Sequence, residues 1–416
     1  MRIKTILNRI ERHPGFVYQQ VSWVEGGEAL SLEVLIRPRV GQQARCSGCG
    51  EETAGYDTLA PRRFAFVPLW GMPVVFVYAM RRVDCARCGV VVERVPWADG
   101  KHRLTHSFAH FLARWAKRLS WQEVAEAFQT SWDTVFRAVE RAVAWGLAHR
   151  ELSGITAIGI DEVLWQRGYR FLTVVYELTA GRRRLLWVGR EREEATLHGF
   201  FDWLGDRVQA LRFICSDMWK PYLHVIVKRA TQALHVLDRF HIVARMNKAI
   251  DEVRAKEAKV LRTRGYEPIL KRTRWLVLKR PENLTEKQEL RLADLMRFNL
   301  RTVRAYLLKE DFQAFWDYVS PAWAGKFLDR WCRRTMRSRL EPMKKIAASL
   351  RAHRELILNW FRARKEISAA AVEGLNGKLK LVTKRAYGFR GYRCLEVALY
   401  HALGDLPEPP VTHRFC

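Results

Sequence analysis

Residues 155–165, ITAIGIDEVLW, form a nearly continuous apolar run that contains one aspartate, Asp161. A second run of the same kind follows, YRFLTVVYEL at 169–178, and a third apolar segment, RRLLWVGRE, occupies 183–191. Short, nearly continuous apolar runs are typical of strands that lie inside a sheet with both faces covered. The sequence therefore predicts three consecutive strands in the interior of a domain.

The sequence after the third strand alternates between helical and strand-like segments. The helical segments are EATLHGFFDWLGDRV at 194–208 and MWKPYLHVIVKR at 218–229. The strand-like segments are QALRFICSD at 209–217 and QALHVLD at 232–238. An order of three strands, helix, strand, helix and strand predicts a mixed α/β sheet.

Two carboxylates lie at or near the ends of these apolar strands. Asp161 lies late in the first strand, and Asp217 closes the fourth. An ionised carboxylate at the edge of a buried strand is costly unless it is paired or binds a metal ion. A single Asp in such a place would usually be a strand-end cap. Two from neighbouring strands can converge on one point, in the region where α/β folds tend to place ligand sites.

A third carboxylate, Glu373, lies in VEGLNGKLK at 372–380, within a strongly basic stretch. If this segment is a helix, its polar face carries Glu373, Asn376, Gly377, Lys380 and Lys384. The opposite, apolar face is expected to pack on the sheet and carries Leu375, Leu379, Val382 and Ala386. The polar face suits a metal ion beside a phosphodiester, with the carboxylate on the metal and the amide and amines (Asn376, Lys380 and Lys384) on DNA. Taken alone, the same pattern would fit an ordinary surface helix.

Together, Asp161, Asp217 and Glu373 are predicted to hold two Mg²⁺ ions. Such a pair clamps the attacking and leaving oxygens of an in-line phosphoryl transfer. One ion would help to deprotonate water or a DNA 3′-hydroxyl, and the other would stabilise the departing 3′-oxygen. The chemistry needs no covalent protein nucleophile.

The chain has 416 residues and a formal net charge of +28, which predicts a polyanionic partner. Nucleic acid is the first candidate and an acidic membrane surface the second. Much of the excess lies in residues 239–365, a helical stretch with 32 Lys or Arg and 14 Asp or Glu. Aromatic residues are interleaved with these charges: Trp275, Trp316, Trp323, Trp331 and Trp360. We interpret this stretch as a DNA-binding insertion rather than a plain helical bundle with solvated basic faces.

Residues 104–149 predict a helix-turn-helix. A short helix near 121–128 is followed by a polar break at 129–131 and by a second helix from Trp132, with Thr130 or Ser131 as its N-cap. The residues expected to face DNA from the second helix are Thr134, Arg137 and Arg141. A plain helical linker is the competing interpretation, because short helical hairpins are common.

Two matching CxxCG motifs, CSGCG at 46–50 and CARCG at 85–89, predict a structural zinc site. Each tight turn aims two thiolates at one point, and the Gly lets backbone amides turn toward sulfur. The four ligands would be Cys46, Cys49, Cys85 and Cys88, a set that suits tetrahedral Zn²⁺ and leaves no open position. The residues between the motifs look like strands. The alternative to a zinc site is that the four cysteines are buried and unrelated to one another.

No segment of the sequence is expected to span a bilayer, and the beginning of the chain has no signal-peptide core. We therefore expect a cytoplasmic protein, in which cysteines serve metal binding or core packing rather than disulfides.

These motifs occur together and in this order in a known family. The chain resembles bacterial insertion-sequence transposases of the ISL-three family, which belong to the DDE superfamily. The resemblance rests on CSGCG with CARCG, GIDEVLWQRGYRFLTVVYEL, SDMWKPY, LDRFHIVARMNKAIDEVR and VEGLNGKLKLVTKRAYGFRGY, which together cover nearly the whole chain.

The resemblance implies a multidomain α+β protein. Its parts would be a zinc-binding N-terminal β module at 1–100, a helix-turn-helix DNA-binding domain at 101–150, the first part of a ribonuclease-H-like mixed α/β core at 151–238, an all-helical basic insertion at 239–365, and the last part of the core with a C-terminal tail at 366–416. The DDE triad would be Asp161, Asp217 and Glu373, with Mg²⁺ or Mn²⁺. Such enzymes bind the terminal inverted repeats of a transposon, cut the double-stranded DNA there and join the 3′-hydroxyl to target DNA. They usually work as homo-oligomers that bring two ends together.

Several alternatives remain open from the sequence. Asp238 also ends a predicted strand, and it could replace Asp217 as a metal ligand or orient His241. Glu162, next to Asp161, should point to the other face of its strand and is not counted as a ligand. The protein could instead be a non-catalytic sequence-specific DNA binder or an inactivated transposase copy. A nuclease of similar fold acting on RNA or branched DNA is disfavoured, because a shape-reading nuclease needs no sequence-reading modules.

Overall fold

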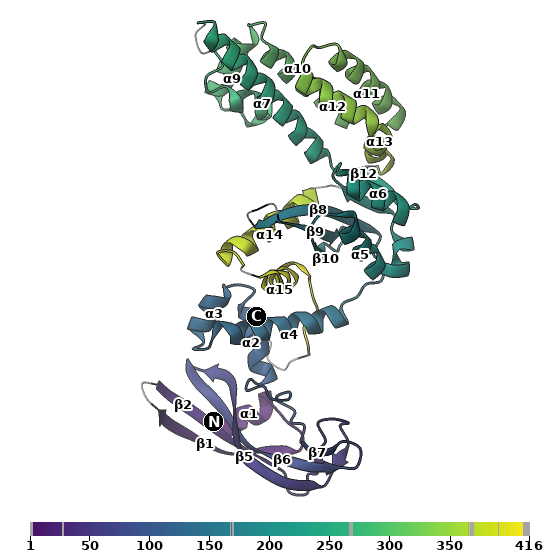
Figure 1. Ribbon diagram of the computed structural model, residues 1–416. Coiled ribbons are helices and arrows are strands. Elements are labelled where there is room, and N and C mark those ends of the chain that lie inside the picture. The colour runs from purple at the N-terminus through teal and green to yellow at the C-terminus, as the bar shows by residue number, and fades with distance from the viewer. Residues whose placement is uncertain are drawn as a thin grey trace. The chain divides into compact units, whose positions relative to one another are not determined.

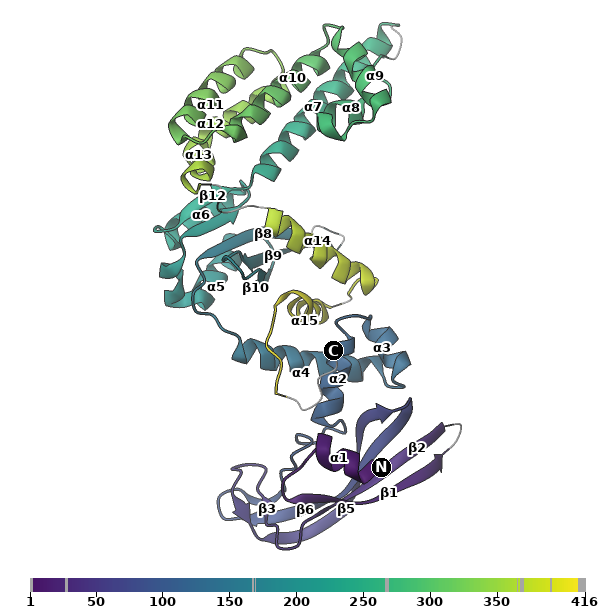
Figure 2. The same cartoon turned by 180° about the vertical axis from the view of Figure 1, so that it is seen from behind.

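The computed structural model describes residues 3–26, 29–166, 168, 170–265, 269–364, 366, 370–389 and 391–410. The chain divides into two compact units, shown from opposite sides in Figures 1 and 2. Unit 1 comprises residues 1–151 and 380–416, and unit 2 comprises residues 152–379. The expected last domain, 366–416, is therefore divided between the two units.

Unit 1 begins with helix α1 (Ile3–Ile10) and a five-stranded sheet. The strands are β1 (Phe16–Gly26), β2 (Ala29–Pro38), β5 (Gly55–Leu69), β6 (Met72–Cys85) and β7 (Gly89–Val92). They are ordered β1-β2-β6-β5, with β7 also on β6, and only β2 and β6 run parallel among these pairs. Aromatic rings fill the core, where Trp97 lies 5.3 Å from Tyr78 and 4.9 Å from Phe16, centroid to centroid. The strands expected between the two cysteine motifs are thus confirmed.

Unit 1 also holds four helices: α2 (His106–Trp115), α3 (Trp121–Ala127), α4 (Trp132–His149) and α15 (Tyr392–Leu403). A capping box starts α3, because the Ser120 hydroxyl accepts the Glu123 N–H and the Glu123 carboxylate accepts the Ser120 N–H. Ser131 caps α4, and Gln129 in the intervening turn has φ +48°. The structure thus forms the two predicted helices with the break in the predicted place.

Unit 2 is built around a second five-stranded sheet. Its strands are β8 (Ala157–Gln166), β9 (Arg170–Glu177), β10 (Arg184–Arg190), β11 (Phe213–Ser216) and β12 (Leu234–Leu237). The spatial order is β10-β9-β8-β11-β12. The three strands β8, β9 and β10 are antiparallel, whereas β11 is parallel to both β8 and β12. All five predicted strands are therefore present, and the sheet is mixed.

The two faces of this sheet are covered by different helices. Helices α5 (Glu194–Leu204) and α6 (Lys220–Arg229) share a core with Ile158 and Ile160 of β8. Helix α14 (Ala370–Arg385) approaches the other face, where a Cβ on Gly159 would lie 2.5 Å from Val372 Cγ2. Because side chains alternate along a strand, Asp161 lies on the same face of β8 as Gly159. The absence of a side chain at Gly159 lets the start of α14 come close to the strand that carries Asp161 (Figure 2).

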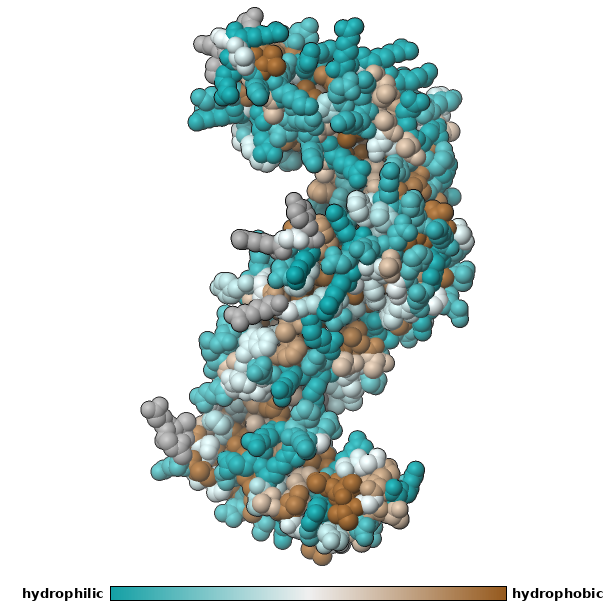
Figure 3. All heavy atoms as spheres, in the orientation of Figure 1, coloured by the Kyte–Doolittle hydropathy of each residue, from teal (hydrophilic) through white to brown (hydrophobic). Residues whose placement is uncertain are grey.

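Seven helices lie between β12 and α14 in the described part of the chain. They are α7 (Arg239–Thr263), α8 (Arg274–Leu278), α9 (Glu286–Met296), α10 (Arg301–Gln313), α11 (Pro321–Met336), α12 (Glu341–Ala352) and α13 (Arg354–Arg362). Their shared core includes Trp316, Trp331 and Trp360, so three of the five interleaved tryptophans serve packing. Trp275 and Trp323 are exposed, each beneath a cation, Arg274 and Lys326. On the face seen in Figure 3, hydrophilic side chains dominate the surface of these helices.

None of the helices in the described ranges combines the length and the apolar character that crossing a membrane requires.

Glu177 is a buried charge in the sheet of unit 2. It is fully buried at the end of β9, and its carboxylate accepts hydrogen bonds from Arg184 Nε at 2.8 Å and pairs with Arg182 Nε at 3.1 Å. Glu177→Ala leaves the buried Arg184 without this partner, so we expect unit 2 to lose about 3 kcal/mol of unfolding free energy in urea titrations. Asp202→Ala, which breaks an exposed pair with Arg229, is the control and should change it by less than about 1 kcal/mol. Equal effects of the two substitutions would contradict a structural role for the buried cluster.

Candidate active site

Three aspartates lie side by side in the sheet of unit 2, Asp161 in the middle of β8 rather than near its end, and Asp217 and Asp238 directly after β11 and β12. In the pairing register Ile160 lies opposite Ser216, and Ser216 lies opposite Leu237. The next residue along each of these parallel strands is an aspartate: Asp161, Asp217 and Asp238. All three are less than a tenth exposed. The expectation that the strand before Asp217 lies beside the strand of Asp161 is confirmed, and Asp238 lies one strand farther away.

The environment disfavours the ionised form of two of these carboxyl groups. Burial raises the pKa of Asp217, and the charge of Asp161 acts in the same direction. Burial also raises the pKa of Asp238 to about 6, to which the charges of Asp161 and Glu373 contribute, while His241 opposes the shift. A bound cation would stabilise the ionised form of carboxyl groups in such a setting.

Backbone donors fix the two aspartates that follow β11 and β12. Asp217 Oδ1 accepts the N–H of Trp219 at 2.9 Å, just before α6. Asp238 Oδ1 accepts the N–H of Phe240 at 2.7 Å and caps α7, while its Oδ2 lies 3.6 Å from His241 Nε2. Asp238 therefore has a structural role as the N-cap of α7, which favours Asp217 over Asp238 as a ligand for an added ion.

Glu162 takes part in a different interaction. Its Oε1 accepts a hydrogen bond from Arg192 at 2.9 Å, and burial raises its pKa, with a further contribution from Asp217. The arginine also lies over the rings of Phe171 and Trp219. This pairing agrees with the expectation that Glu162 is not one of the metal-binding carboxylates.

Glu373 lies in the first turn of α14 and is exposed. Leu375 and Leu379 of the predicted apolar face are buried, as is Val372, whereas Val382 and Ala386 are half-buried and belong to unit 1, so only part of that face can pack on the sheet. Glu373 is near enough to Asp238 to raise the pKa of that carboxyl group. Its side chain thus belongs to the same electrostatic cluster as the three aspartates.

One side chain on α14 has a different environment from the one predicted. Asn376 was placed on the polar face of the helix as a DNA contact, but its amide Nδ2 donates to Asp161 Oδ2 at 2.5 Å, and its Oδ1 accepts from Tyr176 at 2.7 Å. The placement of Asn376 away from the sheet is therefore a correction. The half-buried Asn376 directly follows the buried Leu375, so its side chain can reach the sheet. Lys380 and Lys384, later on α14, are exposed, as a role in DNA contact requires.

The donor set of Asp161, Asp217 and Glu373 fits Mg²⁺ or Mn²⁺, because hard divalent cations prefer carboxylate oxygens. Among the described residues, the four cysteines form a compact group of possible metal ligands, whereas the three carboxylates do not form such a group.

The two cysteine motifs converge in unit 1. The sulfurs of Cys46, Cys49, Cys85 and Cys88 lie within 4.8 Å of one another. The backbone N–H of Cys49, together with that of Gly48, lowers the pKa of the Cys46 thiol to about 6. Gly48 is required in this turn, since a Cβ there would lie 2.8 Å from Cys88 Sγ. The arrangement can hold a tetrahedral metal ion such as Zn²⁺.

The helix-turn-helix presents a basic hollow of about 280 Å³. It is lined by Lys101, His102, Arg103, Leu104, Thr134, Arg137, Ala138 and Arg141. Of the predicted DNA contacts, Arg137 is exposed, Thr134 is half-buried beside Ser131, and Arg141 donates to Asp99 at 3.1 Å. The loop residues Lys101 and Arg103, which also line this hollow, were not among the DNA contacts predicted from the sequence. Two hydrogen bonds from Arg62 to the carbonyls of Gly100 and His102 hold this loop in place.

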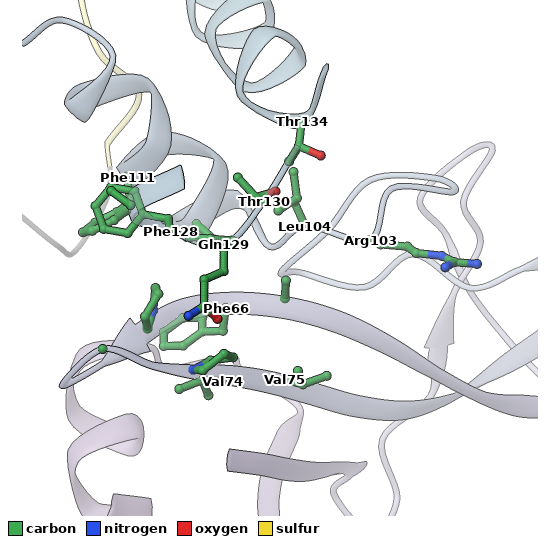
Figure 4. A pocket seen from close by; sticks show the side chains of 16 residues that line it. Phe66, Val74, Val75, Arg103, Leu104, Phe111, Phe128, Gln129, Thr130 and Thr134 are labelled. Atoms are coloured by element: carbon green, nitrogen blue, oxygen red, sulfur yellow. The ribbon is translucent and has the colours of Figure 1, made fainter. Parts of the chain in front are cut away.

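A separate cavity of about 390 Å³ lies below the turn between α3 and α4 (Figure 4). Phe111 and Phe128 line it from the helices, and Phe66 and Val74 line it from β5 and β6. Its walls are mainly apolar and contain no carboxylate, so it has none of the groups needed for metal-assisted chemistry.

The chain matches two family models and several known proteins. A model described as "Transposase" matches residues 158–399, and one described as "Helix-turn-helix domain of transposase family ISL3" matches residues 93–143. The transposase for insertion sequence element IS1557 from Mycobacterium tuberculosis (strain CDC 1551 / Oshkosh) is 31% identical over 94% of this chain and 93% of its own length. The transposase for insertion sequence element IS1001 from Bordetella parapertussis is 29% identical over 90% and 92%. Among solved structures, the Drosophila P element transposase strand transfer complex is 10% identical, with a TM-score of 0.40, and covers 73% of this chain and 92% of its own.

Proposed function

Because the chain belongs to the transposase family ISL3, we propose that it uses Asp161, Asp217 and Glu373 to cut DNA at transposon ends and to join the new 3′-hydroxyl to target DNA. The observation that supports this assignment most is the register of the parallel strands, which sets Asp161 and Asp217 side by side. The charge of Glu373, like that of Asp161, raises the pKa of Asp238, which supports Glu373 as the third member.

The sheet order β10-β9-β8-β11-β12, with three antiparallel strands followed by two parallel ones, supports a ribonuclease-H-like core. Helices α7–α13 would then be an insertion between the second aspartate and the glutamate. Their basic surface suits contact with DNA phosphates, and the exposed Trp275 and Trp323 could stack on nucleic acid.

Asp161, Asp217 and Glu373 would hold Mg²⁺ or Mn²⁺. When bound, these ions supply the Lewis acidity that activates a water or 3′-hydroxyl and stabilises the leaving 3′-oxygen. The buried backbone N–H donors from Glu162 and Trp219 keep the two aspartate side chains in fixed orientations. The exposed Lys380 and Lys384 would bind the phosphates of double-stranded DNA.

The proposal is tested with a DNA fragment that carries both terminal inverted repeats. In Mg²⁺, the purified protein is expected to release 3′-hydroxyl ends and to join them to a second plasmid, and the joined products are detected by sequencing. Each reaction is expected to involve two ends held by an oligomer of the chain. Tight, sequence-specific binding without cleavage in Mg²⁺ or Mn²⁺ would instead support a non-catalytic DNA binder.

The helix-turn-helix would read the end sequence with α4. Arg137→Ala is expected to weaken binding to the terminal repeat by about 10- to 100-fold, because losing a specific arginine contact costs roughly 1–3 kcal/mol. Fluorescence anisotropy over a range of salt concentrations measures the effect. Arg118→Ala, which removes an exposed arginine between α2 and α3, is the matched control and should leave affinity unchanged. Equal affinities of the two variants would show that α4 does not read the DNA.

A further inference from the structure

The side chain of Asn376 connects α14 to two strands of the sheet in unit 2. Its Nδ2 donates to Asp161 Oδ2 at 2.5 Å, and its Oδ1 accepts the hydroxyl of Tyr176 at 2.7 Å. Tyr176 lies on β9, is fully buried, and faces Gly159 of β8 in the pairing register. The contacts join positions 215 and 200 residues apart in the sequence, so only the folded chain can form them.

The direction of these hydrogen bonds is fixed by the chemistry of their ends. An ionised carboxylate only accepts, so the amide must present its N–H₂ group to Asp161. The amide oxygen is then turned to Tyr176, whose hydroxyl must donate. Burial raises the pKa of Tyr176, which keeps the phenol protonated and able to donate. The orientation of the Asn376 amide is thus determined at both ends.

The Asn376 amide helps to fix the orientation of the Asp161 carboxylate. The backbone N–H of Glu162 donates to Asp161 Oδ1 at 2.8 Å, and Asn376 donates to Oδ2. Each oxygen therefore receives a hydrogen bond from a different direction, and rotation of the carboxylate about its χ2 angle would break both. Outer partners of this kind orient ligating carboxylates in metal sites.

Asn376 also lies one helical turn after Glu373, three residues along α14. Residues at this spacing lie next to each other on one side of a helix. The close approach of Val372 to Gly159 fixes the same turn against β8. The contact that orients Asp161 therefore also fixes the rotation of the helix turn that carries Glu373.

We propose that Asn376, held by Tyr176, is a positioning residue that sets the Asp161 carboxylate and the Glu373 helix turn in the geometry that binds divalent ions. The proposal rests on the proposed function, because it assigns Asp161 and Glu373 as metal ligands. Asn376 acts through these two residues and has no direct part in the chemistry.

The experiment compares Asn376→Ala and Tyr176→Phe with wild type in the full-length protein. Mn²⁺ binding without DNA is measured from the electron paramagnetic resonance signal of the free ion, and cleavage of a terminal-repeat duplex is measured separately. Asn376→Ala is expected to lower both Mn²⁺ affinity and cleavage rate by about 10- to 100-fold, the usual effect of losing an outer partner of a ligand. Tyr176→Phe keeps the amide and should have a smaller effect in the same direction.

Asn359→Ala is the matched control for structural damage. Asn359 is a buried asparagine of unit 2 that, like the half-buried Asn376, makes two side-chain hydrogen bonds, to the His235 carbonyl and from Arg362, but these contacts involve none of the proposed ligands. It is expected to lower thermal stability without changing Mn²⁺ affinity. Wild-type Mn²⁺ affinity in Asn376→Ala, or an equal loss of affinity in Asn359→Ala, would overturn the inference.

The Asp161→Asn variant shows whether a negative result concerns the positioning role of Asn376 alone or the proposed function as well. If Asp161→Asn loses Mn²⁺ binding and cleavage while Asn376→Ala keeps both, the positioning role alone is wrong. If Asp161→Asn itself retains full Mn²⁺ affinity and cleavage, the assignment of the ligands is wrong, and the inference falls with it.

Discussion

Replacing Asp161 or Asp217 by Asn, or Glu373 by Gln, is expected to lower the rate of DNA strand cleavage by at least about 10³-fold. A loss of this size corresponds to about 4 kcal/mol of transition-state stabilisation. Each change keeps the shape of the side chain but removes the negative charge that a divalent ion requires. Single-turnover cleavage of a terminal-repeat duplex in Mg²⁺ measures the rate, and anisotropy measures DNA binding, which should remain within about twofold of wild type.

Measuring the stability of these variants distinguishes a loss of catalysis from a loss of folding. Burial raises the pKa of Asp217, so a neutral Asn at this position should not destabilise unit 2. Asp238→Asn is the matched control, because Asn caps a helix as well as Asp and therefore preserves the start of α7. It is expected to retain far more cleavage activity than Asp217→Asn. The opposite ranking would identify Asp238 as the second ligand.

Removal of zinc is expected to have the second-largest effect. Purified protein should contain one Zn²⁺ per chain by elemental analysis, and Cys46→Ser or Cys85→Ser should contain almost none. Both sulfurs belong to a small buried cluster with Ala44 and Val83, so loss of the ion also unfolds local packing. Structural zinc binds small domains with about 10–16 kcal/mol, and a loss of several kcal/mol would lower the melting temperature of unit 1 by about 10 °C.

The zinc prediction also concerns DNA recognition. The cysteine variants should lose affinity for the terminal repeat more than they lose catalysis, because the proposed carboxylate ligands lie in the other unit. Cys394→Ser, at a half-buried cysteine outside the cluster, is the control and should keep zinc, stability and binding. A wild-type protein that contains no zinc would remove the basis for this prediction.

The strands around the proposed site could be predicted closely from sequence. The apolar runs at 155–165 and 209–217 have the length of strands, and they contain all of β11 and all of β8 except Gln166. Asp161 within the first run and Asp217 at the end of the second could be identified because burial of an unpaired charge is costly. The helix-turn-helix was predicted for a similar local reason, since Ser131 is a strong N-cap after a polar break.

Contacts between distant segments could not be predicted in the same way. The partner of Asn376 on β9 is Tyr176, and nothing in the sequence near either residue indicates the other. Gly159 gave a partial signal, because a glycine inside an apolar strand often marks a close approach of another element. The tryptophans interleaved with basic residues in 239–365 favour DNA contact when only the sequence is considered. In the structure, however, Trp316, Trp331 and Trp360 pack inside the helical core. Composition shows that a segment is basic and aromatic, but it does not show which side chains are buried.

The long separation between Asp161 and α14 has a consequence during protein synthesis. A ribosome that adds about 5–20 residues per second needs roughly 10–40 s to pass from Asp161 to Asn376, which lies 215 residues later. From the addition of Asp238 until the synthesis of α14, the growing polypeptide includes the helix-turn-helix and all three neighbouring aspartates, but not Glu373. The ability to cleave DNA would therefore be acquired last. A truncated chain whose translation stops before α14 would lack this ability.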